Sequence, residues 1–248
     1  TARQGIEVGA RPGVAASISV DGNMIISGIS TLGTTSFTAD ATVNSVTVGK
    51  GANSVTSNTV LGVNALDAAV TGNNNTALGY LTLTANTDGV HNTAVGSQAL
   101  TSNTGGDYNT AVGGQALYYT TTGQYNTGLG YDALQDNTTG NHNTALGYQS
   151  LDLNTTASYN TAIGSGSMGS TSTGSSNVAV GYNSLDANTT GTENVAVGMH
   201  ALGSNTTANN NTAVGHDALA QNTTGTRNCA FGYQALDANT TASDNDAF

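Results

Sequence analysis

The chain has 248 residues and carries four basic against fifteen acidic side chains, a net charge of −11. This balance excludes a broad cationic surface, so neither nucleic acid nor an anionic membrane is an expected partner. A single cysteine cannot form a disulfide within the chain, and no apolar run is long enough to insert into a bilayer.

Residues 1–57 show no internal period. Within them the segment 16–30 reads ASISVDGNMIISGIS, in which two alternating β segments flank Asp21-Gly22-Asn23. Because Asp-Gly pairs favour tight turns, this segment predicts a hairpin or a tight bend. A solenoid needs its open end covered, so we interpret residues 1–57 as a β-rich N-terminal cap, shaft or attachment segment.

From residue 58 to residue 248 the chain repeats one unit of 17 residues, N-T-A-V-G-x-x-A-L-x-x-N-T-T-G-x-x. We number its positions as columns one to seventeen, starting at the asparagine. The array holds eleven complete repeats and a partial twelfth, without insertion or deletion. Such self-similarity is typical of a solenoid, in which each repeat is one coil that packs on its neighbours.

The pattern within one repeat favours strands over helices. The apolar columns four and nine are alternately five and twelve residues apart, which does not build the stripe of an amphipathic helix. Columns one to six alternate instead, and Asn-Thr-Thr-Gly at columns twelve to fifteen favours a turn with Gly or Asn at positive φ. The predicted fold is all-β: a parallel β-roll, or β-solenoid, with two short strands per 17-residue coil. Coils stacked at ~4.8 Å would make a rod of roughly 50 Å.

The substitutions in column two indicate which face is inside. Val178 and Val195 replace the usual threonine there, which predicts that columns two and four point inward and meet the leucines of column nine. Cys229 shares column two and is therefore expected to be buried. The asparagines of columns one and twelve are expected to form hydrogen-bonded ladders along the stack.

Column three is then expected on the outside, although it is alanine in nearly every coil. A flat apolar ribbon of this kind favours packing against another copy of the chain, and oligomerisation would add to the small core of a thin coil. The predicted oligomer interface consists of Ala77, Ala94, Ala111, Ala145, Ala162, Ala179, Ala196, Ala213 and Ala230.

The segments NTAVG, NTALG, NVAVG and NTAIG resemble the head repeats of trimeric autotransporter adhesins, which form a left-handed parallel β-roll of shorter period. The fuller pattern NTAVGxxALxxNTTG resembles repeats in tail fibres and other structural proteins of tailed bacteriophages, particularly marine and cyanobacterial ones. The segment VTVGKG at 46–51 also fits the phage context. These resemblances imply a left-handed coil, a homotrimer, and partners among virion or fibre proteins and host-surface glycans or receptors.

No arrangement of residues indicates catalysis, so we expect neither an enzyme nor a cofactor. The four histidines fall in three different columns without the spacing of a metal site, and the calcium-binding nonapeptide and the EF-hand loop are both absent.

Column seventeen holds a ring in five successive coils. If this column is an exposed corner, the rings form a ridge that suits sugars, because each ring has an apolar face and a polar edge. The alternative is that the rings stack along the solenoid and only stabilise it. The candidate glycan-contact residues are His91, Tyr108, Tyr125, His142 and Tyr159.

Three functions remain open on this basis. The first is a trimeric fibre protein of a phage virion, which acts as a rigid spacer and contributes to host-surface binding. The second is a bacterial adhesin or surface-fibre subunit. The third is an ice-binding solenoid, because the threonines of columns thirteen and fourteen would form ladders; their place in a predicted turn beside glycine argues against it.

Overall fold

The computed structural model describes residues 15–18, 24–27, 40–68 and 70–248, and the chain divides into two compact units, Thr1–Thr38 and Ala39–Phe248. In the first unit β1 (Ala15–Ile18) pairs antiparallel with β2 (Met24–Ser27). This pairing agrees with the predicted hairpin, whose turn at 21–23 lies outside the described residues. The boundary expected after residue 57, between an N-terminal segment and the repeat array, stays a prediction.

The second unit begins with a short antiparallel lead-in. Strand β3 (Ala41–Val43) pairs with β4 (Val46–Gly49), and β4 pairs antiparallel with β5 (Thr59–Gly62), the first strand of the repeat array. A single turn of 3₁₀ helix, η1 (Ala52–Ser54), lies between β4 and β5. The carboxylate of Asp40 accepts hydrogen bonds from the backbone amides of Lys50 (2.7 Å) and Gly51 (2.6 Å) and so fixes this lead-in.

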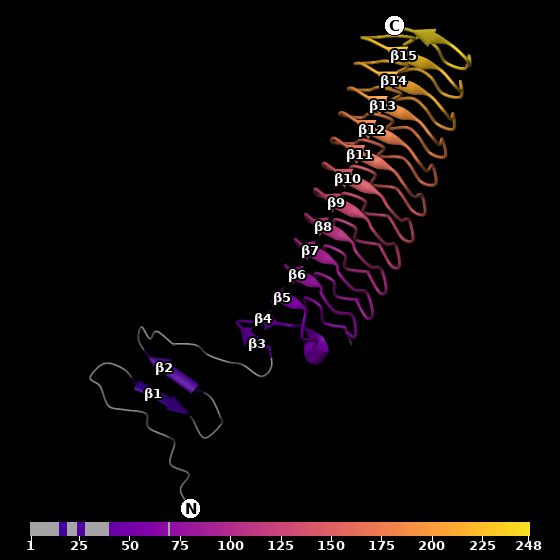
Figure 1. Cartoon of the computed structure of the whole chain (residues 1–248). Coiled ribbons are helices and arrows are strands. Elements are labelled where there is room, and N and C mark those ends of the chain that lie inside the picture. Colours follow the sequence, from indigo (N-terminus) through magenta and orange to yellow (C-terminus); the bar gives the residue numbers. More distant parts are fainter. Residues whose placement is uncertain (1–14, 19–23, 28–39, 69) are drawn as a thin grey trace, which may run out of the picture. The chain divides into compact units, whose positions relative to one another are not determined.

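Each later coil contributes one short strand at columns two to four. These strands pair in parallel at a register of one repeat, as in Thr144 opposite Thr127 and Thr161, and extend a 14-stranded sheet along one side of the stack (Figure 1). This confirms an all-β parallel solenoid of 17-residue coils. The strands are β6 (Thr76–Leu78), β7 (Thr93–Val95), β8 (Thr110–Val112), β9 (Thr127–Leu129), β10 (Thr144–Leu146), β11 (Thr161–Ile163), β12 (Val178–Val180), β13 (Val195–Val197), β14 (Thr212–Val214), β15 (Cys229–Phe231) and β16 (Asp246–Ala247).

The second strand expected in each coil is absent from the described coils, because left-handed residues interrupt the extended backbone. In one coil φ is 136° at Gly147, 50° at Gln149, 53° at Leu151 and 63° at Tyr159, and the same columns repeat this in the other coils. The predicted positive φ at columns twelve to fifteen is therefore wrong. Backbone bonds still join the turns of successive coils, as between Leu117 N and Ala133 O at 3.0 Å.

The side chains of the strand point the opposite way from the prediction. Column three points inward, and columns two and four point outward. Leu129 and Leu146 in column four are 45% and 40% exposed, and Cys229 in column two is only half-buried. The physical reason is space. A methyl group built on Gly128, the glycine in column three, would lie 3.0 Å from Ala133 O and 3.4 Å from the side chain of Leu117, so this coil has little room for a larger side chain opposite column nine.

The alanines assigned to an oligomer interface therefore belong to the core. They are at most 1% exposed and cluster with the buried leucines of column nine, so they offer no surface to a second copy. The correction applies to Ala77, Ala94, Ala111, Ala145, Ala162, Ala179, Ala196, Ala213 and Ala230.

The rest of the interior is polar and hydrogen-bonded, and it contains the predicted asparagine ladders. Asn126 in column one donates from Nδ2 to Gly140 O at 2.8 Å, and its Oδ1 accepts from the backbone amide of Asn143 at 3.0 Å. In column twelve, Asn154 Nδ2 donates to Asn137 Oδ1 at 2.7 Å. These amides satisfy the carbonyls of the turns, which would otherwise be buried without partners.

Candidate functional site

The five rings of column seventeen form one continuous stack. Successive ring centroids, from His91 to Tyr159, are 4.9, 5.0, 4.8 and 5.0 Å apart, and the planes differ by 6° or less. The backbone places them, because each of these residues adopts a left-handed φ at a corner, and Tyr125 N donates to Asp107 O of the preceding coil at 3.0 Å. The rings thus join neighbouring coils, as the structural alternative expects.

Stacking determines which part of each ring a ligand can reach. Neighbouring rings cover the faces of Tyr108, Tyr125 and His142, so their edges and hydroxyls are what remains exposed. Ser176 occupies column seventeen of the next coil, so no ring covers the outer face of Tyr159. Tyr159 is accordingly 63% exposed, against 48% for Tyr125. Within this stack a sugar can lie flat only at the two ends, on Tyr159 or on His91, and would meet ring edges elsewhere.

A shallow groove of about 520 Å³ lies beside the last three rings of this stack, Tyr125, His142 and Tyr159. Its lining contains hydroxyls, amides and rings but no Asp, Glu, Lys or Arg. Asn141 Oδ1 accepts from Gln124 N at 2.7 Å, and Ser158 Oγ accepts from Asn141 N at 3.0 Å, which holds two lining side chains in place. The lining residues are Thr122, Gln124, Tyr125, Thr139, Asn141, His142, Ser158 and Tyr159.

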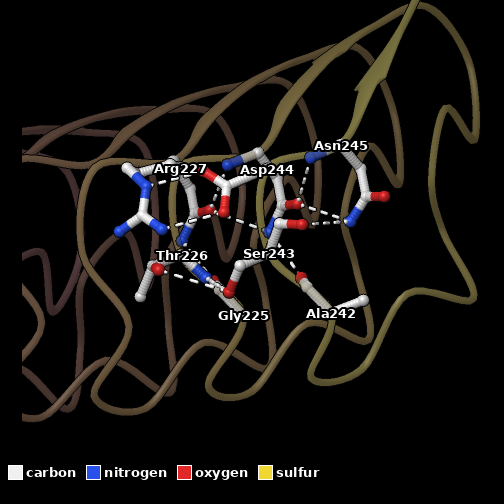
Figure 2. A network of polar contacts seen from close by, with 9 residues as sticks. Gly225, Thr226, Arg227, Ala242, Ser243, Asp244 and Asn245 are labelled. Atoms are coloured by element: carbon white, nitrogen blue, oxygen red, sulfur yellow. Dashed lines mark hydrogen bonds and ion pairs between the residues drawn. The ribbon is translucent and has the colours of Figure 1, made fainter.

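Charged residues replace the rings at the same corner near the end of the chain. Arg227 and Asp244, in column seventeen of successive coils, form a two-bonded ion pair at 2.6 and 2.8 Å, beside a bond from Thr226 N to Ser243 Oγ at 3.0 Å (Figure 2). The bonds from Arg227 lower the pKa of Asp244. Column seventeen therefore joins successive coils in both places, through stacked rings in one and through an ion pair in the other.

Three carboxylates of adjacent coils lie on another side of the solenoid. Burial, followed by the charges of Asp136 and Asp132, raises the pKa of Asp152 to about 6. Its Oδ1 is buried without a hydrogen-bond partner, whereas Asp132 Oδ1 accepts from Gln135 Nε2 at 2.7 Å. Among the described residues no three His, Cys, Asp or Glu side chains are placed to hold a metal ion.

Sequence reasoning located the ring column but missed the side chains around it. Columns fourteen and sixteen form the rest of the groove; the threonines of column fourteen were interpreted as part of a turn, and the variable polar residues of column sixteen carry no distinctive signal in one sequence. It also missed the exposed side of the sheet, because columns two and four were expected to point inward. In the described parts of the chain no helix is long and apolar enough to cross a membrane.

A scan against protein-family models finds no match, and searches of curated proteins and of solved structures find none either.

Proposed function

We propose that this chain is the rigid rod of an extracellular fibre, a tail-fibre segment of a phage virion, with a bacterial surface fibre as the alternative. The observation that carries the proposal is the unbroken register of the array. Every coil is bonded to the next through its strand, its turns and its buried asparagines, as at Thr144, Leu117 and Asn126. Bending such a stack breaks several bonds at once, so the coils resist bending as a unit.

The same proposal assigns the groove beside the ring stack to contact with a host-surface glycan. Uncharged hydroxyl, amide and ring groups suit a neutral sugar, and Tyr159 offers one open ring face. In a homo-oligomeric fibre, for which the resemblance to phage and adhesin repeats favours three chains, several weak sites on one rod bind strongly through avidity.

The location is tested with antibodies raised against the array. Immunogold electron microscopy of purified virions and of bacterial cells from the source culture should show label along fibres of the virions. Label on cell-surface fibres would favour the bacterial alternative. Label confined to the interior of cells would overturn both.

The glycan contact is tested by Tyr159→Ser, which copies the serine of the next coil at the same left-handed corner (φ 61° at Ser176). Binding to host cells or to their purified surface polysaccharide should fall. The matched control is Tyr119→Ser, whose ring is 48% exposed in column eleven, outside both the groove and the strand. Equal binding by both variants and the unchanged protein would remove Tyr159 from the site.

One observation keeps the ice-binding hypothesis as a further candidate. Column fourteen presents exposed threonines in successive coils from Thr122 to Thr241. Column thirteen does not add a second row of free threonine hydroxyls beside it. The hydroxyls of column thirteen donate to backbone carbonyls of the next coil, as from Thr138 Oγ1 to Thr155 O at 2.9 Å. Thermal hysteresis of the purified chain tests this candidate, and its absence would exclude it.

A further inference from the structure

We propose that the outward face of the parallel sheet seats a second copy of this chain. This sheet face consists of columns two, four and six of the eleven complete coils. The inference rests on the proposed fibre function and names the surface through which its copies meet, in place of the buried alanines of column three.

Column four of the sheet face is apolar in every complete coil, and column two beside it is threonine in eight of the eleven. Strands β9 and β10 present Leu129 and Leu146, 45% and 40% exposed, and column six adds Tyr131 and Tyr148, each about half exposed and stacked with centroids 6.0 Å apart. A soluble protein rarely leaves a continuous apolar strip uncovered, so a strip of this kind marks an interaction site. The exposed column-four residues include Leu61, Leu78, Leu129, Leu146, Ile163 and Phe231.

The distribution of charge favours another copy over an oppositely charged partner. Columns two, four and six of the complete coils contain no Asp, Glu, Lys or Arg, although the chain carries a net charge of −11. The acidic residues of the complete coils occupy other columns; Asp152, for example, is in column ten and Glu193 in column seventeen. Two copies that meet through the sheet face therefore keep most like charges apart, and a carboxylate contacts the face at Asp217, 3.0 Å from His216 of column six.

The period of the sheet face also selects its occupant. Successive strands stack in one row along the array (Figure 1). They pair at a register of 17 residues, as in Leu146 opposite Ile163, so the side chains of the sheet face repeat at one coil spacing. A partner can match such a row over its whole length only if its own side chains repeat at the same spacing. A second copy of this chain meets that requirement at every coil.

The size of the sheet face is sufficient. Eleven coils at ~4.8 Å and five residues across the strand at ~3.3 Å give a strip of roughly 50 by 15 Å, or about 800 Å² per copy. Stable interfaces bury about 800 Å² on each partner. Full contact along the strip thus reaches the usual range.

The main test compares two double variants of the full chain. Leu129→Glu with Leu146→Glu places two carboxylates in the centre of the sheet face, and Thr139→Glu with Thr156→Glu places two at exposed positions of column fourteen. Light scattering should show the unchanged protein and the threonine variant as oligomers, and the leucine variant at the monomer mass of 24.6 kDa. A monomeric unchanged protein, or a leucine variant of oligomeric mass, would overturn the proposal.

A second test does not depend on charge. In a Cys229→Ser background, Leu146→Cys puts a thiol in the sixth of the eleven coils, where the copies overlap whether they run parallel or antiparallel. Mild oxidation should convert this variant to a disulfide-linked dimer and leave Thr156→Cys monomeric in a denaturing gel. Equal dimer yields from both cysteines would reject the sheet face, even if the leucine variant fails to fold by circular dichroism.

The outcomes separate this inference from the proposed function. A monomeric chain that still labels virion fibres would remove the sheet face as a seam and leave the fibre function intact. An oligomer that forms through the sheet face but labels neither virions nor cell surfaces would leave the seam intact and remove the fibre function.

Discussion

Asn126 supports its own coil and the next coil with one side chain: its Nδ2 donates to Gly140 O at 2.8 Å, and its Oδ1 accepts from Asn143 N at 3.0 Å. Both partners are backbone groups in the buried interior, out of reach of water. The same pair of bonds recurs at column one along the array, as for Asn143 with Ala157 O and Asn160 N.

Replacing Asn126 with alanine should therefore lower the free energy of unfolding by more than the loss of a few side-chain atoms suggests. The substitution leaves the buried amide of Asn143 without a partner, whereas Gly140 O keeps a bond from Asn137 Nδ2 at 3.2 Å, so the expected cost is about 1 to 3 kcal/mol in the free energy of unfolding. Chemical denaturation measures this loss. The control Thr139→Ala, at an exposed position, should change stability by less than about 0.5 kcal/mol. Similar losses for the two variants would contradict the role given to the asparagine ladder.

Column five should reject any side chain. Gly147 has a φ of 136°, and a methyl group there would lie 2.6 Å from Gly164 O of the next coil. Gly147→Ala is expected to destabilise by about 2 to 5 kcal/mol through backbone strain and overpacking. Gly105, in column fourteen, would meet only the movable carboxylate of Asp88, so Gly105→Ala should be neutral or stabilising by up to ~1 kcal/mol. Thermal unfolding of both variants checks the contrast.

The ring stack should contribute measurably to stability. Tyr125 lies between Tyr108 and His142 at 5.0 and 4.8 Å, and Tyr125→Asn removes both contacts while it keeps a residue that tolerates the left-handed corner. A loss of about 1 to 2 kcal/mol is expected from two aromatic contacts at a half-exposed site. Ser176→Asn, in the same column beyond the stack, is the control and should have no such effect. Chemical denaturation measures this loss. An unchanged denaturation midpoint for Tyr125→Asn would mean that the stack adds nothing to stability.

Asp152 should make stability depend on pH. Its pKa is raised to about 6, mainly by burial, above the usual value of about 3.9 for an unfolded chain. The folded state therefore binds the proton more tightly, so its contribution is complete below about pH 4 and is lost as the pH rises through about 6. At pH 7 Asp152→Asn should be more stable than the unchanged protein by on the order of 1 kcal/mol, after allowance for solvent screening. At pH 4 the difference should vanish.

Asp244 provides the opposite control. The bonds from Arg227 lower its pKa, so its contribution is present at neutral pH and is lost as the pH falls. Asp244→Asn should therefore gain no stability at pH 7. A gain for both variants in denaturation series at pH 4 and pH 7 would point to net charge rather than to burial of Asp152.

The period of the fold was predictable from the sequence, but which side chains of the strand point into the core was not. Asparagine at every seventeenth position predicted the stacking and the buried ladders, because only equivalent places in a solenoid demand the same residue. Hydrophobicity then placed Leu129 inside and Ala111 outside, the reverse of the structure. The volume inside a coil decides this point: Leu117 and the asparagines already fill it, and one sequence does not display that volume.

The candidate site was predictable only in part for a related reason. A column of rings at 91, 108, 125, 142 and 159 predicted an exposed ridge, and the rings do lie at an exposed corner. Left-handed φ angles at Tyr125 and at Leu117 were not foreseen, since neither residue type favours them. Those angles set the corner, bring the rings face to face, and leave only the end rings, His91 and Tyr159, with an uncovered face.

One repeat is also a unit of length for this molecule. The surface that one coil offers above is the one that its neighbour receives below, so excision of residues 143–159 would bring Asn160 against Asn126 with the same bonds. An in-frame duplication or loss of a single repeat in the gene would thus lengthen or shorten the rod by about 4.8 Å without altering either tip. Recombination between near-identical repeats gives a lineage a ready way to adjust the length of the rod.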